Sequence, residues 1–225
     1  MSRLRIRHGE VRRGGRPVLE AGVIDVPLPA AIAVVGINGS GKSSLFMTLA
    51  DVLRGRARSQ ISAAGRPARV AWAPQLPALP GWLTVERTAA LYGLDFRRLA
   101  ATLPGLYLDE LTGRRNRALS AGQRQALSIA IAIGMNASVL LLDEPFSALD
   151  YRRRLGALDI LRARHAGRAR SALLVSSQSA ADLVGLCDHF VVLRDGRYAF
   201  NGPREQLTGG GRDDGIERRL LALLA

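Results

Sequence analysis

The feature that most constrains this chain is the glycine-rich stretch at residues 36–43, Gly-Ile-Asn-Gly-Ser-Gly-Lys-Ser, which matches the P-loop pattern G-x-x-x-x-G-K-[ST]. The apolar run Ala30–Val35 before it predicts a buried strand, and residues 43–53 after it predict a helix with apolar side chains on one side. A strand, a glycine loop and a helix in that order direct backbone amides and the positive end of the helix dipole at one point. The sequence therefore predicts an α/β fold that binds a nucleotide phosphate.

Lys42 is the only lysine among the 32 lysines and arginines of the chain. A compact ammonium can turn its three donors onto phosphate oxygens inside a tight loop, where a planar guanidinium would clash. We expect the Ser43 hydroxyl to ligate Mg²⁺ as well. The predicted phosphate-binding residues of the loop are Gly36, Asn38, Gly39, Ser40, Gly41, Lys42, Ser43 and Ser44.

The composition is that of a single folded domain. With 225 residues, 48% of them hydrophobic and 23% charged, the chain can bury a substantial core. Its longest apolar stretches, 126–135 and 139–142, are shorter than the roughly 20 residues that a membrane-spanning helix needs. The N-terminus lacks the apolar core of a signal peptide, and there is a single cysteine, so we expect a cytoplasmic protein.

The formal net charge of +13 has two interpretations, a nucleic-acid surface or a generally basic one. The basic residues are scattered from end to end, and no aromatic residues alternate with them to form a stacking surface. A generally basic surface is the favoured interpretation, and no direct binding of nucleic acid is expected.

The pattern of elements divides the chain into regions. We expect a core with an antiparallel β subdomain at 1–76 and 121–207, an inserted helical lobe at 77–120 and a tail at 208–225. Residues 1–7 alternate in the manner of an edge strand, and Gly14-Gly15 predicts a turn. Alternating helices and strands after residue 121 predict a mostly parallel sheet. Further predicted strands are 69–72, 139–142, 172–175 and 190–193, and predicted helices are 85–92, 96–103, 106–111, one ending at 135, 151–164, 180–186 and 216–224.

A second element typical of nucleotide sites lies about a hundred residues after the P-loop. Four apolar residues, Val139–Leu142, lead into Asp143 and Glu144, which is the Walker B pattern. A buried strand delivers these carboxylates at its C-terminal end, where open α/β sheets bind ligands. Asp143 is predicted to hold Mg²⁺ through water, and Glu144 to act as the general base that activates a water for attack on the γ-phosphate.

Three further motifs identify a family resemblance. Residues 119–125, Leu-Ser-Ala-Gly-Gln-Arg-Gln, resemble the signature sequence of ABC-type ATPases. Residues 147–150, Ser-Ala-Leu-Asp, resemble their D-loop, and Gln75 matches their Q-loop. The order P-loop, Q-loop, signature, Walker B and D-loop is complete, and the resemblance extends more weakly to residue 207.

The resemblance implies a P-loop NTPase that binds ATP and Mg²⁺ and dimerises head to tail around two nucleotides. It implies that Ser120, Gly122 and Gln123 meet the ATP of the other subunit, that Asp150 links the two sites, and that Gln75 ligates Mg²⁺. It also implies a separate membrane permease, with this chain peripheral on the cytoplasmic face of the membrane. The segment 75–93 is most similar to the ATPases of ABC-2-type exporters, so we expect export.

Two positions depart from the family pattern. Gln178 stands where the switch histidine is expected after the strand 172–175; its amide can donate one hydrogen bond but carries no charge. Arg13 stands where an aromatic residue usually stacks on adenine, although a guanidinium plane can also stack. His165 and His189 do not have the spacing to replace the switch histidine.

Two other functions remain open at this point. One is an ABC ATPase that acts on nucleic acid or ribosomes, although this chain has neither a second ATPase domain nor a long coiled coil. The other is a catalytically weak, nucleotide-sensing subunit, which Gln178 favours.

Overall fold

The strand that precedes the P-loop explains how the layers of this molecule form. In the computed structural model, which describes residues 2–51, 59–178, 181–208 and 215–224, β5 (Ala30–Val35) is buried along its whole length. Ala31 and Ala33 contribute to one apolar cluster, and Ile32 and Val34 to another on the opposite face. Because side chains alternate across a strand, a run that is apolar at every position indicates a sheet covered on both faces. The prediction of a buried strand is confirmed.

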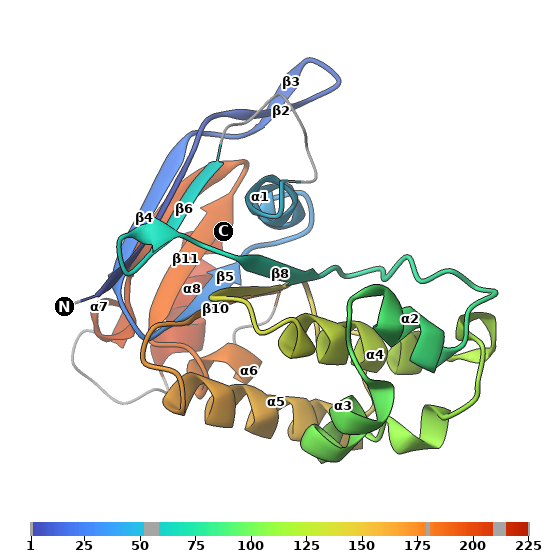
Figure 1. Cartoon of the computed structure of the whole chain (residues 1–225). Helices are drawn as coiled ribbons and strands as arrows, with labels where there is room; N and C mark the ends of the chain where they lie inside the picture. Colours follow the sequence, from blue (N-terminus) through green and yellow to red (C-terminus); the bar gives the residue numbers. More distant parts are fainter. Residues whose placement is uncertain (1, 52–58, 179–180, 209–214, 225) are drawn as a thin grey trace.

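The central sheet has six strands in the order β12-β11-β5-β10-β9-β8 (Figure 1). Every neighbouring pair is parallel except β11 with β12, which is antiparallel. The expected mostly parallel sheet is thus observed. The other five strands of this sheet are β8 (Val70–Ala73), β9 (Val139–Leu142), β10 (Ala172–Ser177), β11 (His189–Arg194) and β12 (Arg197–Pro203).

An antiparallel sheet of four strands, in the order β4-β1-β6-β7, covers one face of the central sheet. The prediction that the N-terminal segment is an edge strand is wrong, because β1 pairs with β4 on one side and with β6 on the other. Its alternation instead reflects an interior strand with one face on the core and one in water, as is common in antiparallel sheets. The strands are β1 (Arg3–His8), β4 (Gly22–Pro27), β6 (Ser59–Ala63) and β7 (Arg66–Pro67).

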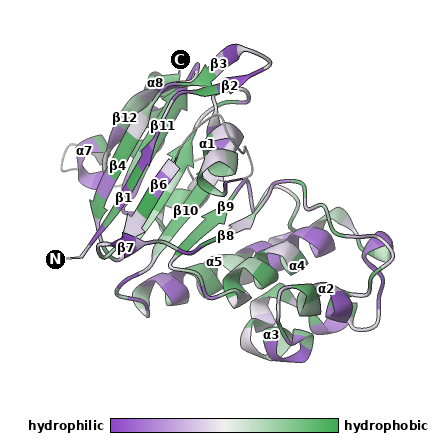
Figure 2. Cartoon of the chain, turned by 45° about the horizontal axis from the view of Figure 1, so that its top comes forward, coloured by the Kyte–Doolittle hydropathy of each residue, from purple (hydrophilic) through white to green (hydrophobic). Residues whose placement is uncertain are grey.

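Helix α1 (Lys42–Leu49) follows the P-loop and buries Leu45, Phe46 and Leu49 in the cluster shared by the two sheets. Its predicted last two residues, 52 and 53, lie outside the described residues. A small hairpin of β2 (Val11–Arg13) and β3 (Arg16–Leu19), with the expected turn at 14–15, packs beside α1. The hairpin is the hydrophilic projection at the top of Figure 2, in contrast to the apolar strands of the central sheet.

The opposite face of the central sheet is covered by helices, among them α4 and α5. These are continuous with the predicted helical lobe, which projects to the right in Figure 1. Residues 106–111 were expected to form a helix, yet they contain the end of one 3₁₀ turn and all of another, with Tyr107 between them at a φ of 51°. The elements are α2 (Val85–Leu91), α3 (Phe96–Thr102), η1 (Pro104–Leu106), η2 (Asp109–Leu111), η3 (Asn116–Ala118), α4 (Ala121–Gly134) and α5 (Tyr151–Ala166).

The C-terminal region contains α6 (Ala181–Val184), α7 (Arg204–Thr208) and α8 (Ile216–Leu224). Residue 180 of the predicted helix 180–186 and the glycines at 209–211 lie outside the described residues. Helix α8 has the predicted bounds and buries Ile216 and Leu220 in the cluster beneath the central sheet. No helix in the described ranges is long and apolar enough to cross a membrane.

Candidate nucleotide-binding site

The P-loop joins β5 to α1 and bends through two glycines in the left-handed region. Gly39 has a φ of 83° and Gly41 a φ of 106°, conformations that side chains with a Cβ rarely adopt. At Gly36, a Cβ would lie 2.2 Å from the Ser40 Oγ, so the loop closes too tightly for any other residue. Helix α1 has no side-chain cap at its N-terminus. The free amides of its first turn are therefore available to bind an anion.

Lys42 is held over this loop. Its Nζ donates to the carbonyl oxygens of Gly36 at 2.7 Å and Ile37 at 3.3 Å, and it lies 3.3 Å from the Glu144 Oε1. The lysine and glutamate side chains are only 6% and 8% exposed. The predicted phosphate ligand and the predicted base thus form a buried ion pair, and an anion entering the loop would compete with Glu144 for the ammonium.

The two carboxylates follow β9, as predicted, and a serine of the neighbouring strand holds both. The Ser176 Oγ donates to the Asp143 Oδ1 at 2.5 Å and accepts the backbone N–H of Glu144 at 2.8 Å. Glu144 has a φ of 46°. Ser176 was not predicted from the sequence, although the register of β10 against β9 could have identified it: Val175 pairs with Leu142, so the next residue of β10 lies beside Asp143.

A pocket of about 300 Å³ brings most of the predicted residues together. Gln75 and Arg13, from segments far from the P-loop in the sequence, both contribute to it. Val18 also lines this pocket and was not predicted. The lining residues are Arg13, Val18, Asn38, Gly39, Ser40, Gly41, Lys42, Ser43, Ser44, Gln75 and Glu144.

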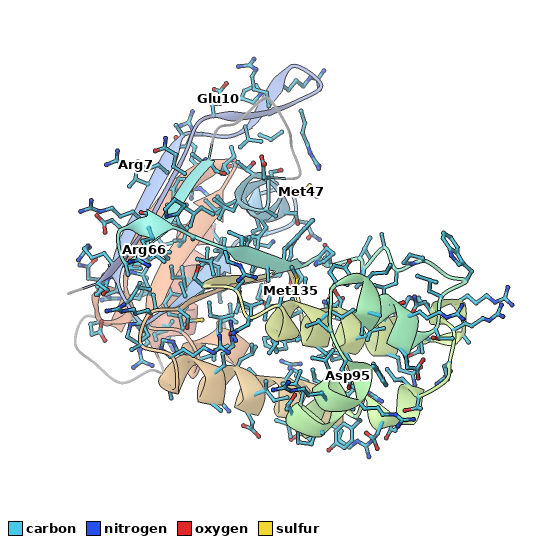
Figure 3. All side chains as sticks on the ribbon, viewed as in Figure 1. Arg7, Glu10, Met47, Arg66, Asp95 and Met135 are labelled. Atoms are coloured by element: carbon cyan, nitrogen blue, oxygen red, sulfur yellow. The ribbon has the colours of Figure 1, made fainter. Side chains whose placement is uncertain are left out.

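Arg13 lies on the hairpin at the mouth of the pocket, and its side chain is exposed. Its Nη2 is 3.0 Å from the sulfur of Met47, a residue of α1 labelled in Figure 3. The structure therefore puts a guanidinium at the pocket, and none of the residues that line it is aromatic.

One buried polar atom in the pocket indicates what the pocket can hold. Within the described residues the Ser40 Oγ is buried and forms no hydrogen bond, whereas the buried Glu144 Oε1 is ion-paired with Lys42. Buried polar groups are nearly always paired, so the Ser40 hydroxyl needs a polar ligand or water. A hydroxyl donor, an ammonium and free amides fit a phosphate, and Ser43, Gln75 and Asp143 are oxygen donors of the kind that Mg²⁺ takes together with substrate phosphates.

The predicted signature residues lie outside this pocket. Ser120 caps α4: its Oγ accepts the backbone N–H of Gln123 at 3.2 Å, and the Gln123 Oε1 accepts the Ser120 N–H at 3.0 Å. At Gly122, a Cβ would lie 2.6 Å from the carbonyl oxygen of Ala148. The signature is therefore packed directly against the D-loop, and only a glycine permits that contact.

Asp150 also lies outside the pocket and caps α5. Its carboxylate accepts the backbone N–H of Arg153 at 2.9 Å and the guanidinium of Arg153 at 2.6 Å. These two bonds hold the pKa of Asp150 below its usual value. Arg153 in turn contacts Glu110 of the lobe at 2.5 Å. The D-loop is thereby tied to the helical lobe.

Gln178, which stands at the position expected for the switch histidine, is exposed and is not among the residues that line the pocket. It follows β10 directly, on the same edge of the sheet as Asp143 and Glu144. Gln178 thus lies at the edge of the sheet that carries the acidic residues, outside the pocket.

Comparisons with known proteins identify the family of this chain. A profile of the ABC transporter family matches residues 24–147. The hemin import ATP-binding protein HmuV of Streptomyces coelicolor is 32% identical over 220 residues, which cover 89% of this chain and 78% of that protein. The aliphatic sulfonates import ATP-binding protein SsuB of Corynebacterium glutamicum is 33% identical over 191 residues, covering 81% and 76%. A solved structure of the ATP binding subunit of an ABC transporter superposes with a TM-score of 0.82 at 25% identity, covering 99% of both chains.

Proposed function

Because the chain belongs to the ABC transporter family as an ATP-hydrolysing subunit, we propose that it drives transport through a separate membrane permease, as a head-to-tail dimer that binds two MgATP. In this proposal the chain is peripheral, on the cytoplasmic face of the membrane. The observation that carries the proposal is the buried Lys42, held over an uncapped helix N-terminus and paired with Glu144.

In this proposal, the residues at the phosphate site have three different roles in ATP hydrolysis. Lys42 and the loop amides bind and orient the β- and γ-phosphates. Ser43, Gln75 and Asp143 would hold Mg²⁺, which neutralises phosphate charge that develops during transfer. Glu144 accepts a proton from the attacking water once phosphate has drawn Lys42 away from it. The buried ion pair therefore keeps the base occupied until the nucleotide enters.

The position of the signature residues supports a dimer, because these residues do not line the pocket of their own subunit. Ser120 and Gly122 lie at the exposed N-terminal end of α4, outside the pocket of their own subunit. The N-terminus of a helix is suited to bind phosphate, because the positive end of the helix dipole lies there. In the proposal, that end closes over the nucleotide held by the P-loop of the other subunit.

The direction of transport has two candidates. The segment 75–93 favours export, by its similarity to ABC-2-type ATPases. The relatives HmuV and SsuB are import ATP-binding proteins, which favours import. Inside-out membrane vesicles that contain the permease distinguish the two, because added ATP makes an exporter accumulate substrate inside the vesicle.

The phosphate site is tested with Lys42→Ala. We expect MgATP affinity to fall about 100-fold or more, because the change removes charge-assisted hydrogen bonds inside a buried site. The matched control is Arg7→Ala, which removes one positive charge from the exposed face of β1; Arg7, labelled in Figure 3, does not line the nucleotide pocket. Titration with a fluorescent ATP analogue measures both variants, and unchanged affinity in Lys42→Ala would contradict the assignment.

A further inference from the structure

Ser176 occupies a place in the sheet that connects the two halves of the nucleotide site. Strand β10 lies between β5, which leads into the P-loop, and β9, which leads into Asp143 and Glu144. Ser176 pairs with Val34 of β5 and is fully buried. A hydroxyl placed there is a polar group in the apolar interior of the sheet, and such a group is costly unless it is hydrogen-bonded.

Both hydrogen-bonding functions of this hydroxyl are used. Its proton goes to the Asp143 Oδ1 at 2.5 Å, and its oxygen accepts the Glu144 N–H at 2.8 Å. One side chain therefore touches both acidic residues of the site, the first through its carboxylate and the second through its backbone. No carbon side chain of similar size could replace either bond.

The first bond fixes the orientation of a carboxylate. Within the described residues, the other oxygen of Asp143, Oδ2, accepts no hydrogen bond, so the Ser176 bond is the only one that determines how this carboxylate is turned. Partners that hydrogen-bond to a metal ligand in this way orient the ligand and tune its affinity for the metal. The hydroxyl bond thus leaves one carboxylate oxygen free for the metal or its water.

The second bond stabilises an unusual backbone. A glutamate at a φ of 46° is in the left-handed region, which non-glycine residues adopt only when their surroundings hold them there. Ser176 holds the N–H of Glu144, and the Ser147 hydroxyl donates to its carbonyl oxygen at 2.9 Å. The two serines thus each hydrogen-bond to one of the peptide groups on either side of Glu144. The Glu144 side chain pairs with Lys42.

We propose that Ser176 is a positioning residue that orients Asp143 for Mg²⁺ and holds Glu144 at the phosphate. The proposal rests on the function proposed above and adds to it a residue that lies outside every motif of the sequence. The proposal therefore predicts that nucleotide binding by the P-loop without metal does not depend on Ser176. The gain in nucleotide affinity that Mg²⁺ provides does depend on Ser176.

Three variants of Ser176 test the proposal. Ser176→Ala removes both bonds, Ser176→Cys keeps nearly the same volume with a poor donor and acceptor, and Ser176→Thr keeps the hydroxyl. The matched control is Ser171→Ala, which removes a buried hydroxyl just before the start of β10, where the Ser171 Oγ donates to the Arg168 carbonyl oxygen at 3.2 Å. Fluorescent ATP is titrated in EDTA and then in rising Mg²⁺, with thermal melting as the check on folding.

We expect Ser176→Ala and Ser176→Cys to bind the nucleotide in EDTA within about twofold of the native chain. In the same variants, the Mg²⁺ concentration that gives half of the Mg²⁺-dependent gain in nucleotide binding (the Mg²⁺ midpoint) rises about 10- to 100-fold. This is the usual effect of removing a residue that hydrogen-bonds to a metal ligand. Ser176→Thr restores the native midpoint to within a few-fold, and Ser171→Ala keeps it.

Three results would overturn the proposal: native Mg²⁺ midpoints in folded Ser176→Ala and Ser176→Cys, an equal loss of nucleotide binding with and without Mg²⁺, or a Ser176→Thr variant as defective as Ser176→Cys. If Ser176→Ala does not fold, Ser176→Cys and Ser176→Thr decide alone. Failure of the native chain to bind any nucleotide is a different outcome, because it contradicts the proposed function itself.

Discussion

The two ends of the nucleotide pocket are built differently. At the phosphate end, the P-loop follows β5 and the acidic residues follow β9, two strands on either side of β10 in the central sheet, and Lys42, Asp143 and Glu144 are all buried. At the mouth, the short β2–β3 hairpin contributes Val18 and the exposed Arg13. The phosphate end is therefore part of the protein core, whereas the mouth is formed by a hairpin that packs beside α1.

This difference determines where binding energy and selectivity arise. Buried charges and fixed amides interact strongly because little water screens them. An exposed guanidinium contributes little, since water competes for it, and it stacks on any base with similar strength. We therefore expect the triphosphate to supply most of the affinity and the base to supply little discrimination.

The largest effect is expected at the buried end, from Glu144→Gln. Phosphate release should fall about 10²- to 10⁴-fold, because the general base is lost while the shape of the site is kept. Affinity for MgATP should be retained, since an amide no longer competes as a charge for Lys42. Phosphate release and size-exclusion chromatography with MgATP measure turnover and the trapped dimer.

The control for this variant is Glu10→Gln. Glu10, labelled in Figure 3, is an exposed acid just before β2 and pairs with Arg12 at 2.6 Å. The substitution should leave turnover within about twofold, as expected for an exposed pair. A Glu144→Gln chain that stays monomeric with MgATP at high concentration, with the permease present, would contradict head-to-tail closure.

A much smaller effect is expected at the mouth. Arg13→Ala should weaken ATP about two- to fivefold, the range of an exposed cation–π contact, with nearly the same factor for GTP. Arg12→Ala on the same hairpin is the control, because Arg12 is held by Glu10 and the Gly15 carbonyl and does not line the pocket. A loss above about 50-fold in Arg13→Ala would show that the mouth carries the affinity.

The smallest effect is expected from Gln178→His. Because Gln178 is exposed and outside the pocket, we expect steady-state phosphate release to change less than about threefold. The measurement is made with and without the permease. A rise above about tenfold would show that this position reaches the γ-phosphate in the assembled transporter, and that glutamine limits the rate there.

The buried end was predictable from the sequence because its signals are local. The residues of the P-loop and Walker B motifs follow strands whose apolar character is complete, and the strand–loop–helix order leaves few ways to arrange them. Gln75 was expected at the site from its motif alone, and it lines the pocket.

What the sequence did not predict depends on register between distant segments. Ser176 acts through its place beside Asp143, which follows only from the pairing of β10 with β9. β1 proved to be an interior strand because β6 pairs with the side of β1 opposite β4, and that partner lies between fifty and sixty residues further along the chain. Val18 reaches the pocket through the position of a hairpin that no motif defines.

The most direct test of the account is a titration of the native chain with ATP, GTP, ADP and AMP in excess Mg²⁺. If the buried phosphate end supplies the affinity, ATP and GTP should bind within about tenfold of each other, and AMP should bind about 100-fold more weakly than ATP or worse, since it lacks the β- and γ-phosphates that Lys42 holds. AMP binding as tightly as ATP, or GTP binding as weakly as AMP, would contradict the account.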